Sequence, residues 1–178
     1  GVARADPVAL LTRTPAHEKE VLSLAYSGAD GEESSLLVSG GRDRLIHVYD
    51  TSSYHSCQTL DNHSSSVTAL RFVGAPSAPR EERAAQLLSC GGDKALVLSH
   101  VRGGEITRYK SIICSGTIYD MDIDPLHRFV VTAGQDKRLN IWQAASDKPV
   151  RSYKPSPAVG HGVIRGSTAA DDDELGAG

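Results

Sequence analysis

A pattern of strand, tight turn and strand recurs three times in this sequence, at residues 37–49, 87–99 and 130–142. In each copy an apolar run ends in glycine, a turn carries an aspartate followed by lysine or arginine, and a second run has alternating apolar residues. This order is typical of a β-hairpin. The turn aspartates, Asp43, Asp93 and Asp136, lie 50 and 43 positions apart. Internal repeats with a period of this size indicate a propeller or a solenoid.

Further strand-like segments flank each hairpin. Apolar runs precede the hairpins at residues 21–26, 67–72 and 118–123, and shorter runs follow them at 55–60, 106–110 and 150–154. Four strands repeated three times predict an all-β chain, a partial β-propeller of about three four-stranded antiparallel blades. A single blade cannot bury both faces of its sheet, so the blades must stack on one another. Because a closed ring typically has about four to eight blades, we expect a fragment of a larger ring, with blades missing from this chain or supplied by another chain.

The repeats divide the chain into five expected segments. They are an N-terminal lead-in or incomplete blade (1–16), blade one (17–63), blade two (64–110), blade three (111–154) and an acidic tail (155–178). The tail is rich in Gly, Ala, Pro, Ser and acidic residues, which cannot bury enough apolar area to offset their ordering entropy, so we expect it to be disordered. The chain begins with Gly1 rather than Met, which indicates a fragment or a processed piece.

Charge and cysteine content exclude several classes of protein. The net charge is −3, and residues 155–178 alone carry −3, so the repeats are neutral. A neutral body argues against nucleic-acid binding, which depends on clustered positive charge. No segment approaches the ~18–20 continuous apolar residues that span a bilayer, and no secretion signal opens the chain. Cys57, Cys90 and Cys114 are widely spaced, which favours free thiols in a reducing compartment such as the cytoplasm.

The repeat pattern resembles that of the WD-repeat family. The resemblance rests on Ser/Thr, three residues, Asp, five residues and an aromatic, with His17 and His63 each four residues before a first strand. In that family a His, a Ser/Thr, the turn Asp and a strand aromatic form a buried hydrogen-bonded set in each blade. Carried over by position, the set comprises His17, Ser39, Asp43, Tyr49, His63, Ser89, Asp93, Thr132, Asp136 and Trp142. Two positions depart from the pattern: Ser99 stands where the aromatic belongs, and Cys114 stands where the His belongs, so Asp136 is expected to find its partners in the turn backbone.

Several stretches are similar to a narrower group within that family. They are residues 41–48, 58–69, 88–94 and 119–124, and the likeness extends over residues 17–154. The group consists of large WD-repeat scaffolds that bind mitogen-activated protein kinases, including a member at mitotic spindle poles. The resemblance implies a non-catalytic protein–protein interaction scaffold with partners in the mitogen-activated protein kinase pathway, located in the cytoplasm and at the centrosome or spindle pole. In that group the kinase-binding region lies largely outside these blades, so no residue here is assigned to kinase binding.

Other functions stay open or are disfavoured. A propeller that presents substrates to a ubiquitin ligase or another multi-protein enzyme complex is an alternative, and so is a truncated product without independent function. No nucleophile motif, Ser-His-Asp order or phosphate loop indicates an enzyme or a cofactor. The seven histidines are scattered along the sequence without the close pairs of a zinc site, which predicts no metal. Asp120, Asp122 and Asp124 alternate along one strand and are interpreted as solvated.

The hairpin turns carry a set of cations. They are Arg42, Arg44, Lys94, Lys137 and Arg138. In a propeller these turns gather on one rim, so the five side chains are brought to one face. One interpretation is that turn positions are simply solvated and charged. The other is a docking surface for an acidic or phosphorylated peptide.

Overall fold

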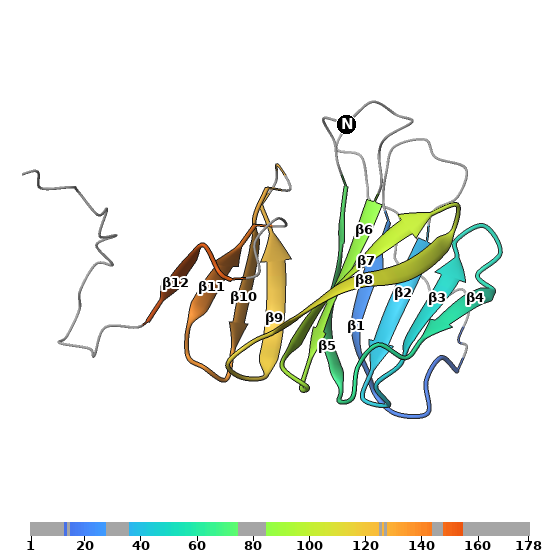
Figure 1. Cartoon of the computed structure of the whole chain (residues 1–178). Coiled ribbons are helices and arrows are strands. Elements are labelled where there is room, and N and C mark those ends of the chain that lie inside the picture. The colour runs from blue at the N-terminus through green and yellow to red at the C-terminus, as the bar shows by residue number, and fades with distance from the viewer. Residues whose placement is uncertain are drawn as a thin grey trace, which may run out of the picture.

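The computed structural model describes residues 13, 15–27, 36–74, 85–124, 126, 128–143 and 148–154, which form three four-stranded antiparallel sheets (Figure 1). Blade one consists of β1 (Val21–Tyr26), β2 (Leu36–Gly41), β3 (Ile46–Asp50) and β4 (Ser56–Leu60). Blade two consists of β5 (Val67–Val73), β6 (Ala85–Gly91), β7 (Ala95–Arg102) and β8 (Glu105–Ile113). Blade three consists of β9 (Ile118–Ile123), β10 (Val130–Gly134), β11 (Leu139–Trp142) and β12 (Arg151–Tyr153).

The all-β fold class expected from the repeats is confirmed. Each sheet follows the order of the chain, so every strand pairs with its sequence neighbours, as in a propeller blade. Among the described residues there is no helix, and therefore none that could cross a membrane. Most of the N-terminal lead-in (1–16) and the whole tail expected to be disordered (155–178) lie outside the described residues.

One strand is longer than the sequence predicts. The fourth strand of blade two was expected at residues 106–110, but β8 runs from Glu105 to Ile113 and pairs with β7 along its whole length. The two strands are joined by Gly103 and Gly104, which both have positive φ angles, +58° and +84°. Glycine adopts this conformation without steric strain, so a two-residue turn suffices and the pairing extends to both ends of the hairpin.

The apolar core lies between the sheets, in two clusters. The first joins blades one and two and includes Val38, Val48 and Leu70, and the second joins blades two and three and includes Leu88 and Met121. Alternate residues of a strand point to opposite faces, which explains how neighbouring residues of β6 enter different clusters. Each interface is therefore a stack of two sheets, and blade two is covered on both faces.

Hydrogen bonds also join neighbouring blades. The amide of Leu70 on β5 donates to Ser23 Oγ on β1 over 3.0 Å, and Thr68 Oγ1 on β5 donates to the carbonyl oxygen of Ile118 on β9 over 2.6 Å. At the outer edge the Gln58 side chain donates to the carbonyl oxygen of Ile106 (2.8 Å) and accepts from its amide (2.9 Å). The first strands of the blades thus lie side by side, and Gln58 covers two backbone groups on the edge of β8.

The acidic residues of β9 are not simply solvated. Arg71 on β5 approaches Asp120 (Nη2 to Oδ1, 3.5 Å) and Asp122 (Nε to Oδ1, 3.7 Å) across the interface of blades two and three. Both carboxylates are largely exposed, so solvent screens these ion pairs and each adds little stability. The interpretation of these acids as merely solvated is corrected, since they share a cation on the next blade.

Glycines let the connection between blades approach the hairpin turn. Gly91 and Gly134 each stand two residues before a turn aspartate. A Cβ at Gly91 would overlap the carbonyl oxygen of Ser66, and one at Gly134 would overlap that of Thr117. Because the overlapping atoms belong to backbone that packs against the turn, the site has no room for a side chain.

Candidate functional site

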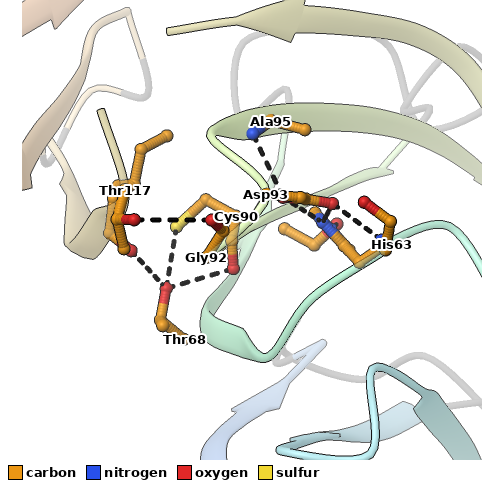
Figure 2. Close-up of polar contacts among 10 residues, drawn as sticks. His63, Thr68, Cys90, Gly92, Asp93, Ala95 and Thr117 are labelled. Carbon is orange, nitrogen blue, oxygen red and sulfur yellow. Dashed lines mark hydrogen bonds and ion pairs between the residues drawn. The ribbon is translucent and has the colours of Figure 1, made fainter. Parts of the chain in front are cut away.

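Blade two contains a buried network centred on His63. Its Nδ1 lies 2.9 Å from Asp93 Oδ2, and its Nε2 lies 2.8 Å from Ser89 Oγ (Figure 2). A carboxylate only accepts hydrogen bonds, so Nδ1 must carry the proton, and the neutral ring then accepts the Ser89 hydroxyl proton at Nε2. Burial lowers the pKa of His63, although the charge and hydrogen bond of Asp93 act in the opposite direction. The ring is therefore held neutral in the tautomer that serves both partners.

Blade one repeats this arrangement around His17. Its Nδ1 lies 2.9 Å from Asp43 Oδ1, and its Nε2 lies 2.8 Å from Ser39 Oγ. Burial works to raise the pKa of Asp43, but hydrogen bonds from His17 and from the backbone outweigh it, and the pKa lies below its usual value. Tyr49 was expected to take part in this set. It is half-buried, and the hydrogen bonds of the described residues include none between Tyr49 and Ser39.

In blade three the network is split into two parts. Trp142 Nε1 donates to Thr132 Oγ1 over 2.8 Å, and both residues are buried. Asp136 accepts from the Arg138 amide (3.0 Å), from Asn140 Nδ2 (2.9 Å) and from Ser115 Oγ (3.0 Å). The expectation that Asp136 relies on the turn backbone is corrected, because two side chains supply most of its donors.

The side chains that replace the missing histidine were not found from the sequence. Asn140 also accepts at Oδ1 from Ser152 Oγ on β12 over 2.7 Å, so the two side chains link β11 and β12 to the turn. Asn140 is buried four residues after the turn aspartate. A polar residue in the second strand of the hairpin, in a blade without the histidine, is the sequence signal that could have indicated it.

The turn aspartates have the same structural role in all three blades. Each accepts a hydrogen bond at Oδ1 from the amide two residues later, at 3.2, 3.1 and 3.0 Å for Asp43, Asp93 and Asp136. Through Oδ2 each also accepts from the segment that enters its blade: from the Glu18 amide (3.1 Å), the Ser64 amide (3.0 Å) and the Ser115 hydroxyl (3.0 Å). These carboxylates therefore fasten the hairpin turn to the connection from the preceding blade.

The turns hold one residue each in a left-handed conformation. Arg44, Lys94 and Lys137 directly follow the aspartates and have φ angles of 79°, 66° and 60°. The amide of each donates to the carbonyl oxygen three residues earlier, at 3.3, 3.2 and 3.1 Å. Positive φ is unfavourable for a residue with a Cβ, so the turn is held by its aspartate and its hydrogen bonds. The turns are thus rigid supports for their cationic side chains.

The five expected rim cations lie on the same edge of the molecule. The turns β2–β3, β6–β7 and β10–β11 follow the lower edge in Figure 1. Arg42 forms an exposed ion pair with Glu20 (3.4 Å), and Arg138 donates from Nη1 to Ser152 Oγ (3.4 Å). Thr117 Oγ1 of the next connection donates to the carbonyl oxygen of Gly92 beside the blade-two turn over 3.4 Å (Figure 2). The structure therefore brings the turns to one rim, and Glu20 partly neutralises it.

The Ser-His-Asp sets resemble a catalytic triad in connectivity only. The sequence argument found no such order, whereas the structure joins these residue types in blades one and two. A nucleophilic serine must reach a substrate, and an acyl-transfer site needs oxyanion donors beside it. Ser39 and Ser89 are instead fully buried beneath neighbouring residues. This geometry serves the folded blade rather than nucleophilic attack.

Three possible metal ligands meet on blade one. The ligand atoms of His17, Asp43 and His47 lie within 4.8 Å of one another, so the statement that the histidines are scattered is wrong in space. Both ring nitrogens of His17 are already hydrogen-bonded to Asp43 and Ser39, and His47 Nδ1 lies 2.9 Å from Thr59 Oγ1. A metal would have to break the blade network, so these residues fit a hydrogen-bonded cluster better than a zinc site.

A groove of about 500 Å³ lies between the outer strands of blades one and two. Its lining includes Leu36, Asp50, Gln58 and Glu105. Three hydrogen bonds at Oδ1, from Ser52 and Ser53, lower the pKa of Asp50. The lining contains no histidine, lysine or arginine. The groove offers acidic and amide groups for contact but no pair of groups suited to acid–base catalysis.

Sequence comparisons agree with this repeated geometry. The model of the family described as "WD domain, G-beta repeat" matches residues 9–50 and 107–143. The chain belongs to the WD-repeat family. WD-repeat proteins act in general as protein-interaction scaffolds and are typically non-catalytic, and the two buried networks fit that general role. The blade that the family model does not match, blade two, still has the His63, Ser89 and Asp93 set of a WD blade.

The relatives are much longer proteins. WD repeat-containing protein 62 of Mus musculus is 38% identical over 151 residues, which is 82% of this chain and 9% of the relative. Mitogen-activated protein kinase-binding protein 1 of Homo sapiens is 35% identical over the same length, 10% of that protein. Nuclear distribution protein PAC1 of Arthroderma otae is 29% identical over 138 residues, 75% of this chain and 28% of the relative. The chain thus spans about a tenth of the first two relatives.

Proposed function

We propose that this WD-repeat segment is part of a non-catalytic scaffold whose cationic rim binds an acidic or phosphorylated segment of a partner protein. The observation that carries the proposal is the threefold turn, in which a rigid left-handed residue presents Arg44, Lys94 or Lys137 on one edge. Fixed cations lose little entropy on binding, and lysine and arginine pair well with carboxylates and phosphates. Recognition of phosphorylated or acidic motifs by clustered cations is a common binding mode.

We further propose that the partners belong to the mitogen-activated protein kinase pathway and that the site of action is the cytoplasm, including the centrosome or spindle pole. The similarity to a protein named for binding mitogen-activated protein kinases supports the first part. Affinity purification of the full-length protein followed by mass spectrometry tests it. Enrichment of kinases or other components of this pathway supports the proposal, and their absence contradicts it.

The rim itself is tested by reversing its charge. Fluorescence anisotropy with a labelled phosphoserine-containing peptide measures binding to the wild-type chain and to the variant Lys94→Glu/Lys137→Glu. We expect the variant to lose most of its affinity, and the wild-type affinity to fall as salt is raised because the contacts are exposed charges. Arg102→Glu is the matched control, since Arg102 is an exposed cation at the end of β7, on the edge opposite the rim. Equal affinities of the rim variant and the wild type would contradict the proposal.

A further inference from the structure

The first strand of blade one exposes positions that are core positions in the other two blades. Val21 is 45% exposed, whereas the equivalent residues Val67 and Ile118 are 0% and 3% exposed. Leu24 is 61% exposed, whereas its equivalents Leu70 and Met121 are 0% and 2% exposed. The residue types are equally apolar in all three blades, so the difference lies in what covers them. We call the sheet surface that carries Val21 and Leu24 the front face of blade one.

Blade three shows the same contrast on its opposite surface. Leu139 is 51% exposed, whereas the equivalent residues Ile46 of blade one and Leu96 of blade two are 0% and 1% exposed. Val131 and Ile141, which share this surface, are also partly exposed, although their equivalents in the other blades are buried. We call the surface with Val131, Leu139 and Ile141 the back face of blade three.

The two internal interfaces define which kinds of surface fit together. In the first, Val67 and Leu70 from the front face of blade two pack with Val38, Ile46 and Val48 from the back face of blade one. In the second, front-face residues of blade three, Ile118 and Met121, pack with back-face residues of blade two, Leu88, Leu96 and Leu98. Front faces thus pack on back faces in both cases. The described part of the chain leaves one surface of each kind uncovered.

We propose that a second copy of this chain covers both surfaces, with the front face of blade one in each copy packed on the back face of blade three in the other. An interface between two different surfaces of the same protein is heterologous and forms a ring if its rotation closes. Two copies supply six blades, which is within the usual range of about four to eight for a closed propeller. Both surfaces continue the packing that the chain already uses between its own blades.

Charges along the inner strands do not oppose this docking. The acids nearest the back face of blade three, Asp120 and Asp122, are already paired with Arg71. Blade one has Ser23 and Ala25 at the positions equivalent to Ala69 and Arg71 of β5. No acidic residue of β1 would therefore face the two aspartates, and the dry apolar residues form the centre of the contact.

Sedimentation of the purified chain and of single-face variants tests the proposal. We expect the wild type to have twice its chain mass of 18.9 kDa. Each interface of the ring needs one front and one back face, so Leu24→Glu alone and Leu139→Glu alone should both give monomers. An equimolar mixture of the two variants should form dimers again, because the intact back face of the first meets the intact front face of the second. Leu126→Glu, at an exposed leucine in the β9–β10 turn, is the control and should stay dimeric.

Other results overturn the proposal. A monomeric wild type would leave these surfaces to blades of another polypeptide. A dimer that survives either single substitution would indicate contact between two like faces, and a mixture that stays monomeric would exclude head-to-tail docking. Trp142 is the sole tryptophan and is buried between blades two and three, so its emission reports whether each variant is folded. Should Leu24→Glu fail to fold, Val21→Glu on the same face takes its place, with the same expected loss of the dimer.

Discussion

Blades two and three hold their turn aspartates in different ways. In blade two one imidazole, that of His63, bridges Asp93 and Ser89 in a single buried chain of hydrogen bonds. In blade three Cys114 takes the place of the histidine, and the pKa of its thiol is raised to about 11 by burial and by the charge of Asp136, so it stays an uncharged thiol. The Asp136 carboxylate is instead held by Asn140, the Arg138 amide and Ser115.

The difference shows what the fold requires at this position. The carboxylate must fasten the hairpin turn to the connection from the preceding blade, and in both blades it does so with hydrogen bonds of similar length. The identity of the donors is free. What blade three lacks is the link from the aspartate to Thr132, so its turn and its strand pair are anchored separately. We therefore expect one substitution to disrupt blade two as a unit, whereas blade three yields in parts.

The largest effect is expected for His63→Ala. The substitution leaves the Asp93 carboxylate without its ring donor and the buried Ser89 hydroxyl without its acceptor, at a loss of about 3 kcal/mol in the free energy of unfolding. Urea unfolding followed by circular dichroism measures it. His55→Ala is the matched control because His55 is exposed before β4, and it should leave the midpoint unchanged. Similar midpoints for the two variants would show that the blade-two network does not stabilise the fold.

The next effect is expected for Asp136→Ala. It removes the common acceptor of three donors and should lower the free energy of unfolding by about 1–3 kcal/mol. Asp120→Ala removes a largely exposed carboxylate that pairs only with Arg71 across 3.5 Å, and should have little effect. If both variants unfold at the same urea concentration, the assignment of Asp136 as the anchor of blade three is wrong.

Acid should weaken blade two at a higher pH than blade three. The pKa of His63 is lowered in the folded chain, so its contribution is complete above the unfolded value of about 6.5 and is lost as the pH falls through the folded pKa. The pKa of Asp136 is also lowered, because the donors named above outweigh its burial, and its contribution is lost only below the unfolded value of about 3.9. Hydrogen exchange of blade-two amides should therefore accelerate first on acidification, and simultaneous loss in both blades would argue against this order.

A smaller effect is expected for Trp142→Phe. It removes the indole donor of Thr132 and some packing volume, at a loss of about 1–2 kcal/mol. Tyr49→Phe at the equivalent position of blade one should change nothing, since the hydrogen bonds of the described residues include none from Tyr49 to Ser39. Thermal unfolding of the two variants compares the positions directly. A loss of stability in Tyr49→Phe equal to that in Trp142→Phe would mean that the tyrosine hydroxyl has a structural role after all.

The smallest effect is a gain. Lys137→Gly relieves a positive φ of 60° and should raise the free energy of unfolding by about 0.5–1 kcal/mol, since glycine adopts this conformation freely. Arg138→Gly, one residue later and outside the positive-φ set, should lower stability instead, because glycine adds freedom to the unfolded chain. Thermal midpoints distinguish the signs. A loss for both variants would show that the turn is not strained at Lys137.

Much of the fold follows from local sequence patterns. The spacing of Asp43, Asp93 and Asp136 and the alternating strands predict three four-stranded sheets, because strand pairing within a blade is local in sequence. The end of β8 at Ile113 could not be predicted in the same way, since it depends on full pairing with β7 rather than on its own residues. The resemblance to WD repeats placed His63 and Ser89 in one network, which the structure shows as direct contacts.

The remaining contacts depend on how the blades stack. Arg71 with Asp120, and Gln58 with Ile106, join residues 48 or more positions apart across blade interfaces. No periodic pattern specifies which polar side chain reaches the next sheet. Asn140 and Ser115 replaced the histidine of blade three for the same reason, because side-chain reach in the folded turn decides which donors meet a carboxylate.

The central claim is that a neutral His63 bridges Asp93 and Ser89 inside blade two. Two-dimensional ¹⁵N–¹H correlation of the imidazole nitrogens tests it most directly, with His63→Gln used to assign the signals. The structure predicts that at pH 7 Nδ1 carries the proton and Nε2 does not, and that the ring gains its second proton only below pH ~6.5. A proton on Nε2 in the neutral ring, or an imidazolium at pH 7, would contradict the account.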